Sequence, residues 1–86
     1  MKIYFSHYFE ENTSNLSRSV KKILRKKIAL LEENPNHPSL RTKKIQGQRY
    51  IFEATVTMNI RLTWQYYKNG ILLRKIGEHD KTLRDP

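Results

Sequence analysis

The sequence has 86 residues, which is enough for one domain over residues 1–86 with a thin hydrophobic core. It has no cysteine, which excludes disulfides and cysteine-based zinc sites. Lysine and arginine number 17 against 8 aspartate and glutamate, a formal charge of +9 that indicates nucleic acid, an acidic protein or an anionic membrane surface as partner. No apolar run has membrane-spanning length and no signal peptide is recognisable, so we expect a cytoplasmic protein that does not enter a membrane.

The first half of the chain reads as a strand followed by helices. Residues 1–5 alternate in strand fashion, and residues 8–11 are expected to form a short helical turn. Residues 16–33 have apolar side chains at three- and four-residue spacings, which predicts an amphipathic helix. Pro35 disfavours helical geometry in Asn34, so the helix is predicted to end there. The apolar stripe is Leu16, Val20, Ile23, Leu24, Ile28 and Leu31, and the basic face is Arg18, Lys21, Lys22, Arg25 and Lys26.

The second half reads as strands. Apolar and polar residues alternate over residues 50–57 and 61–66, and residues 71–76 form a further strand. The tail, residues 81–86, is expected to be a loose end. The predicted fold class is α+β, with an N-terminal strand and one or two helices packed on a curved antiparallel sheet of about four strands. Turns are predicted at Gly47-Gln48, Met58-Asn59 and Asn69-Gly70, the last being a strong hairpin signal.

Pairing of the strands places polar residues on one face of the sheet. A hairpin at Met58 that sets Phe52 opposite Leu62 gathers apolar residues on the core face. Glu53 then lies opposite Arg61 on the other face. A two-residue turn at Gly47-Gln48 adds Lys44 to that same face.

The hairpin at Asn69-Gly70 leaves two registers open. One register puts Arg61 beside Glu78, and the other puts it beside Ile76. Both keep Arg61 within a couple of residues of His79, which follows the end of the last predicted strand. We therefore expect a polar face with a histidine at its rim.

These residue types suit the cleavage of RNA by attack of its own 2′-hydroxyl. That reaction needs a base, cations that stabilise the charged phosphorane, and an acid for the leaving oxygen. His79 can exchange protons near neutral pH, and Arg61 can hold a phosphate with its planar fork. Glu53 is the candidate base, and Lys44 adds positive charge. The chemistry requires neither a metal nor a cofactor.

Each of these residues also has a structural explanation. Glu53 and Arg61 can be a cross-strand ion pair, and His79 can be a loop histidine bonded to backbone. The basic face of the helix can be a solvated surface or can follow a phosphate backbone. His7 and His37 are expected to be surface or cap residues, and Tyr50, Phe52 and Trp64 are expected in the core rather than as a base-stacking platform.

The order and spacing of several segments resemble the RelE/ParE superfamily of toxins from bacterial toxin–antitoxin modules. The resemblance covers nearly the whole chain and implies the RelE-like microbial RNase fold. It rests on the basic helical half that ends at Glu32-Glu33-Asn34-Pro35-Asn36-His37-Pro38-Ser39-Leu40, then on Lys44-Ile45-Gln46-Gly47, Phe52-Glu53-Ala54, Arg61-Leu62 and Gly77-Glu78-His79-Asp80.

The resemblance implies one of two activities. RelE-like toxins cut messenger RNA in the ribosomal A site without metal, whereas ParE-like toxins poison DNA gyrase. In the first branch, the arginine before a leucine on the central strand binds the phosphate, and Arg61 matches it. His79 matches the histidine of the YoeB-like and YafQ-like subgroups, which acts near the leaving group. Binding of RNA or phosphate is assigned to Lys43, Lys44, Arg74 and Asp80.

The sequence departs from the family pattern at the remaining site positions. Phe52 and Ala54 stand near the places where RelE carries a lysine pair. Asp80 follows His79, and the tail lacks the tyrosine of RelE and YoeB. The histidine and aspartate of YafQ on the preceding hairpin fall near Thr55 and Asn59. Glu53 is therefore the first candidate for the general base and Asp80 the second.

Three functions follow from this sequence. The leading hypothesis is a ribosome-dependent mRNA endonuclease, the toxin of a toxin–antitoxin system, with Arg61 and His79 as catalytic residues and Glu53 as base. The alternatives are a non-catalytic gyrase inhibitor and a catalytically degenerate basic module that binds nucleic acid. Expected partners are the ribosome, mRNA and an antitoxin with an acidic, partly disordered segment. We expect a monomer alone and a hetero-oligomer with the antitoxin.

Overall fold

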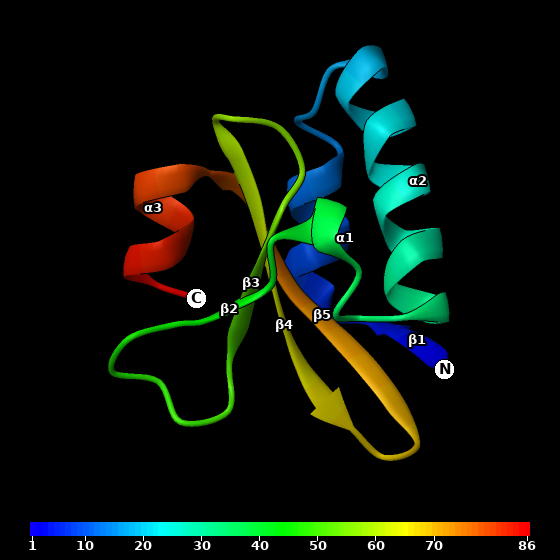
Figure 1. Cartoon of the computed structure of the whole chain (residues 1–86). Helices are drawn as coiled ribbons and strands as arrows, with labels where there is room; N and C mark the ends of the chain where they lie inside the picture. Colours follow the sequence, from blue (N-terminus) through cyan, green and yellow to red (C-terminus); the bar gives the residue numbers. More distant parts are fainter.

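The computed structural model describes residues 1–86 and has two groups of helices on a central sheet (Figure 1). Helices α1 and α2 lie on one side of the sheet, and α3 lies on the other. In chain order the elements are β1 (Lys2–Phe5), α1 (His7–Thr13), α2 (Arg18–Glu33), a 3-10 turn (Pro38–Leu40), β2 (Lys43–Lys44), β3 (Phe52–Thr55), β4 (Ile60–Tyr67), β5 (Gly70–Glu78) and α3 (His79–Arg84). None of the helices has the length and hydrophobicity of a membrane-spanning segment.

The long helix α2 is bounded by local signals in the sequence. It begins at Arg18, two residues later than predicted, because the Ser17 hydroxyl caps it by accepting from the backbone N–H of Val20. It ends before Asn34, as Pro35 predicts. Its apolar stripe faces the sheet, where Leu24 and Leu31 are buried; Ile23, which was predicted to join them, is exposed.

The sheet has five strands in the order β1-β5-β4-β3-β2, one more than predicted. It is not wholly antiparallel, because β1 pairs in parallel with β5. The two strands approach so closely at Gly70 that a Cβ there would lie 2.0 Å from the carbonyl oxygen of Lys2. Only glycine fits at position 70, where β1 pairs with β5 and forms the edge strand of the sheet.

The register between β3 and β4 differs from the prediction by two residues. Phe52 lies opposite Trp64 rather than Leu62, and Arg61 lies opposite Thr55 rather than Glu53. The turn at Met58-Asn59 is present, because Thr57 and Ile60 exchange both backbone hydrogen bonds across it. The predicted pairing was wrong because it centred the turn one residue too early, at Thr57. A shift of two residues leaves every side chain on its predicted face.

The register between β4 and β5 lies between the two predicted alternatives, with Arg61 opposite Gly77. The turn is formed by Lys68 and Asn69, and Lys68 has a positive φ of 52°. A bulge then adds Arg74 to β5, since Thr63 pairs with Lys75 whereas Trp64 pairs with Leu73. Because of this extra residue, the pairs from Thr63 back to Ile60 are shifted by one position along β5 relative to the pairs nearer the turn.

The C-terminal residues form a helix rather than the loose end expected from the sequence. Glu78 caps α3, because its carboxylate accepts from the backbone N–H groups of Asp80 and Lys81. The helix covers the polar face of β4 and β5, and it buries Thr63 and Thr82. A six-residue helix has too few turns for a periodic apolar pattern, which explains why the sequence did not predict it.

The core lies between the sheet and helices α1 and α2. Trp64 is buried at its centre and stacks on Phe52 with ring centroids 4.6 Å apart, as the sequence predicted for both. The prediction was wrong for Tyr50, which is 69% exposed on the connection between β2 and β3. The buried apolar cluster comprises Phe9, Leu24, Leu31, Leu40, Ala54, Val56, Leu62, Trp64, Ile71, Leu73 and Ile76.

Candidate active site

Arg61 and Glu53 meet on the polar face of the sheet, at the start of β4. The Nε atom of Arg61 lies 3.6 Å from Oε1 of Glu53. The cross-strand ion pair considered as an alternative is therefore present, and its two side chains are largely buried, at 16% and 13% exposed. Arg61 Nε is buried and has no hydrogen-bond acceptor.

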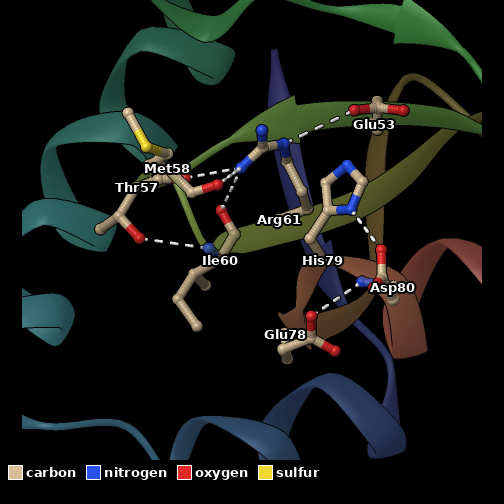
Figure 2. A network of polar contacts seen from close by, with 8 residues as sticks. All are labelled: Glu53, Thr57, Met58, Ile60, Arg61, Glu78, His79 and Asp80. Carbon is tan, nitrogen blue, oxygen red and sulfur yellow. Dashed lines mark hydrogen bonds and ion pairs between the residues drawn. The ribbon is translucent and has the colours of Figure 1, made fainter.

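The connection between β3 and β4 holds the guanidinium of Arg61 in place. One amino group, Nη1, donates to the backbone oxygens of Thr57 at 2.6 Å and Met58 at 2.7 Å. Figure 2 shows these bonds at one end of the guanidinium and Glu53 on the Nε side. The second amino group, Nη2, has no partner within the protein. The sequence did not reveal these carbonyl contacts, because backbone acceptors leave no residue-type signal.

His79 is the first residue of α3 and stands at the rim of the same face. Its backbone N–H donates to the carbonyl oxygen of Asn59 at 2.8 Å, which ties α3 to the β3–β4 connection. Its ring is 43% exposed, and Nδ1 lies 2.9 Å from Oδ1 of Asp80. The ring is therefore not bonded to backbone, and Nε2 is free. In Figure 2 the Nε2 corner of the ring points toward Arg61 and Glu53.

The two lysines of β2 do not share a face. Lys43 lies opposite Glu53 and so belongs to the face that carries Arg61. Lys44 lies opposite Phe52, which places it on the other face. The prediction that Lys44 lies on the face of Arg61 is wrong, because the connection between β2 and β3 is longer than the two-residue turn assumed at Gly47-Gln48.

Arg74 does not join the group around Arg61. It is the extra residue of the bulge in β5, and its guanidinium donates to the backbone oxygen of Pro86 at 3.2 Å and to the side-chain oxygen of Gln65. These contacts hold the Arg74 side chain against the C-terminal residue, away from Arg61. Thr63 donates to the same Pro86 oxygen at 3.1 Å, so both side chains hold the segment after α3.

The other two histidines have the surface roles expected of them. His7 pairs with Glu11 at 2.7 Å on the exposed side of α1. His37 caps the 3-10 turn, since its Nδ1 accepts from the backbone N–H of Ser39 at 3.2 Å. No three or more histidine, aspartate or glutamate side chains are grouped as metal ligands.

The site thus brings together an immobilised cation, a largely buried carboxylate and an imidazole with one free nitrogen. Arg61, Glu53, His79 and Asp80 come from three elements, β3, β4 and α3, and are drawn together in Figure 2. An anion with a transferable proton is the kind of ligand that this combination fits.

No family model matches the sequence, and no curated protein is significantly similar to it. Solved structures are similar. The chain resembles YafQ in the E. coli DinJ–YafQ toxin–antitoxin complex with a TM-score of 0.78 and 15% identity, over 93% of each chain.

Two further structures are similar over nearly their full length. The chain resembles the RelB–RelE antitoxin–toxin complex from Methanococcus jannaschii with a TM-score of 0.72 and 18% identity, over 95% of each chain. It resembles the YoeB/ParE toxin from Agrobacterium tumefaciens with a TM-score of 0.79 and 10% identity, over 92% of this chain and 99% of that one. The chain therefore has the fold of the RelE/ParE toxin superfamily.

Proposed function

We propose that this protein is the toxin of a toxin–antitoxin system and that it cleaves messenger RNA on the ribosome. The observation that carries the proposal is the grouping of Arg61, Glu53 and His79 on one face of a RelE-like fold. The reaction is attack of the RNA 2′-hydroxyl on the adjacent phosphorus. The bond from phosphorus to the 5′-oxygen breaks, leaving a 2′,3′-cyclic phosphate and a 5′-hydroxyl.

Arg61 binds the scissile phosphate. Its Nη1 is occupied by the carbonyls of Thr57 and Met58, so the guanidinium is fixed before substrate arrives. The unpartnered Nη2 is the group that donates to a phosphate oxygen. A fixed cation of this kind stabilises the phosphorane without reorganising during the reaction. Lys43 adds positive charge on the same face.

His79 protonates the leaving 5′-oxygen through Nε2. The Asp80 carboxylate accepts from Nδ1–H, which fixes the ring orientation and leaves Nε2 as the nitrogen that gains and loses the proton. As an imidazolium, His79 delivers that proton to the 5′-oxygen as its bond to phosphorus breaks. Asp80 thus acts on the ring rather than on the RNA.

Glu53 takes the proton from the 2′-hydroxyl. Its carboxylate lies beside the phosphate-binding Arg61, whereas Asp80 is bonded to the His79 ring. Replacing Glu53 by glutamine removes the base but keeps the shape of the side chain. We expect the single-turnover cleavage rate to fall by about 100-fold or more, because base catalysis typically contributes at least that factor.

The control for this prediction is Glu33→Gln, at the exposed end of α2, which should cleave at the wild-type rate. Both variants should unfold at the wild-type temperature within a few degrees. A Glu53→Gln protein that cuts as fast as the wild type would move the role of base to Asp80.

The function is tested in a reconstituted translation reaction in which the 5′ ends of a defined message are mapped. Cuts at A-site codons that require ribosomes support the proposal. The fold is also that of a YoeB/ParE toxin, so the second arm measures DNA supercoiling by gyrase. An intact message together with inhibited supercoiling would replace the endonuclease by a gyrase inhibitor, since that activity needs no acid–base histidine.

The proposed function includes an antitoxin as partner. The similar YafQ and RelE structures are complexes with DinJ and RelB. The basic charge of this chain attracts an acidic segment, which we place over the Arg61 face or over the exposed basic face of α2. A complex that leaves both surfaces exposed would contradict this placement.

A further inference from the structure

We propose that a cavity at the far end of β4 is a base-stacking subsite for the single-stranded RNA whose phosphate is bound at Arg61. The inference rests on the proposed endonuclease function and names a second contact with the same substrate. The cavity has a volume of about 480 Å³. It is lined by Lys44, Arg49, Tyr50, Phe52, Gln65 and Tyr66.

The cavity exists because the edge of β4 is uncovered there. β3 begins at Phe52, which pairs with Trp64, so Gln65 to Tyr67 have no partner on that side. The connection between β2 and β3 loops out past this edge instead of continuing the sheet (Figure 1). Gln65 shares the face of Arg61 by alternation and Tyr66 faces the other way, so the cavity surrounds an open strand edge.

The two tyrosine rings of the cavity are exposed, and the ring of Tyr66 is held in place by its neighbours. Tyr66 is 50% exposed, and its ring packs edge-on against Trp64 at 5.0 Å and Phe52 at 5.9 Å. Tyr50 is more exposed still and makes no aromatic contact within the protein. Two exposed rings that line one cavity together with two cations are what a stacking platform requires.

The positive charge of the cavity favours binding of a nucleic acid. Lys44 and Arg49 are exposed, and no carboxylate lines the cavity. Cations that follow the phosphates, together with rings that stack on successive bases, are the general means by which proteins bind single strands without reading their sequence. Lys44, which the register excludes from the Arg61 face, acts here instead.

The spacing along β4 connects the two sites. Gln65 follows Arg61 by four residues, which corresponds to roughly 13 Å at about 3.3 Å per residue. A few nucleotides of an extended strand span that length. RNA held by Arg61 at the scissile phosphate therefore has a base within reach of Tyr50 and Tyr66.

The test measures binding of a short 2′-O-methyl RNA strand by fluorescence anisotropy, which needs neither ribosomes nor cleavage. The variants are Tyr50→Leu and Tyr66→Leu, with Tyr50→Phe and Tyr66→Phe as matched replacements that keep the ring. Tyr8→Leu removes an exposed tyrosine from α1, outside the cavity. We expect each cavity leucine variant to weaken binding by about tenfold, and the Phe variants and Tyr8→Leu to bind as the wild type.

An abasic strand of the same length separates stacking from charge. Its affinity should be lower than that of the normal strand for the wild type and should be unchanged by Tyr50→Leu. Equal affinities of the leucine variants and the wild type for the normal strand would overturn the subsite, and so would a wild-type protein that binds no RNA. Cleavage by the wild-type protein is measured separately in the reconstituted reaction. If it cuts message there although the binding results overturn the subsite, the endonuclease function stands without the subsite.

Discussion

The His79→Ala variant is expected to cleave ribosome-bound message about 100- to 10,000-fold more slowly than the wild type. The imidazole is the group that gives a proton to the leaving 5′-oxygen, and alanine leaves nothing in its place. The backbone of His79, which donates to Asn59 and begins α3, is retained in the variant. The measurement is the single-turnover rate at saturating protein, with the fold checked by circular dichroism.

The matched control for this variant is His7→Ala, because His7 lies in an exposed pair with Glu11 on α1, outside the site. It should cut at the wild-type rate. If His79→Ala also cuts at that rate, the assignment of the acid is wrong. The cleavage rate of Asp80→Asn should lie between those of His79→Ala and His7→Ala. The His79 ring then loses the carboxylate that orients it but keeps its proton.

The Trp64→Ala variant is expected to lose about 3–5 kcal/mol of unfolding free energy. Trp64 is buried at the centre of the core and stacks on Phe52, so alanine leaves a large cavity that neighbouring side chains cannot fill. A domain of this kind has a total stability of roughly 5–15 kcal/mol, so the variant loses a large fraction of it. Urea unfolding followed by circular dichroism measures the change.

Two replacements bracket this result. Met58→Ala truncates a side chain that is exposed on the β3–β4 connection and should leave stability within about 0.5 kcal/mol of wild type. Trp64→Phe should cost less than Trp64→Ala, because it keeps a ring and removes an indole N–H that is buried without a partner. A Trp64→Ala protein as stable as Met58→Ala would contradict the described core.

The sequence predicted the faces of the sheet better than its pairing. Periodicity of two along β4 assigned Arg61 to the polar face and Trp64 to the core, and both assignments are confirmed by the structure. The register between β3 and β4 was wrong, yet the error of two residues preserved those faces. Register depends on the position at which the turn is centred, which the local pattern of Val56 to Ile60 does not determine.

Other features depend on long-range contacts that have no local signal. The bulge at Arg74 and the short helix α3 are stabilised by contacts with Gln65, Thr63 and Pro86. Tyr50 was predicted to be buried because it continues the alternation of β3, but the strand begins only at Phe52. The same alternation therefore predicted a core residue where the structure has an exposed ring.

The chemistry of the cleaved ends tests the central claim most directly. Message cut by the wild-type protein on ribosomes is isolated, and the new termini are analysed by their response to a phosphatase that acts on 2′,3′-cyclic phosphates and to a kinase that requires a 5′-hydroxyl. Attack by the 2′-hydroxyl predicts a cyclic phosphate upstream and a 5′-hydroxyl downstream. A 3′-hydroxyl with a 5′-phosphate, the products of attack by water at the other side of the phosphate, would contradict the roles given to Glu53, Arg61 and His79.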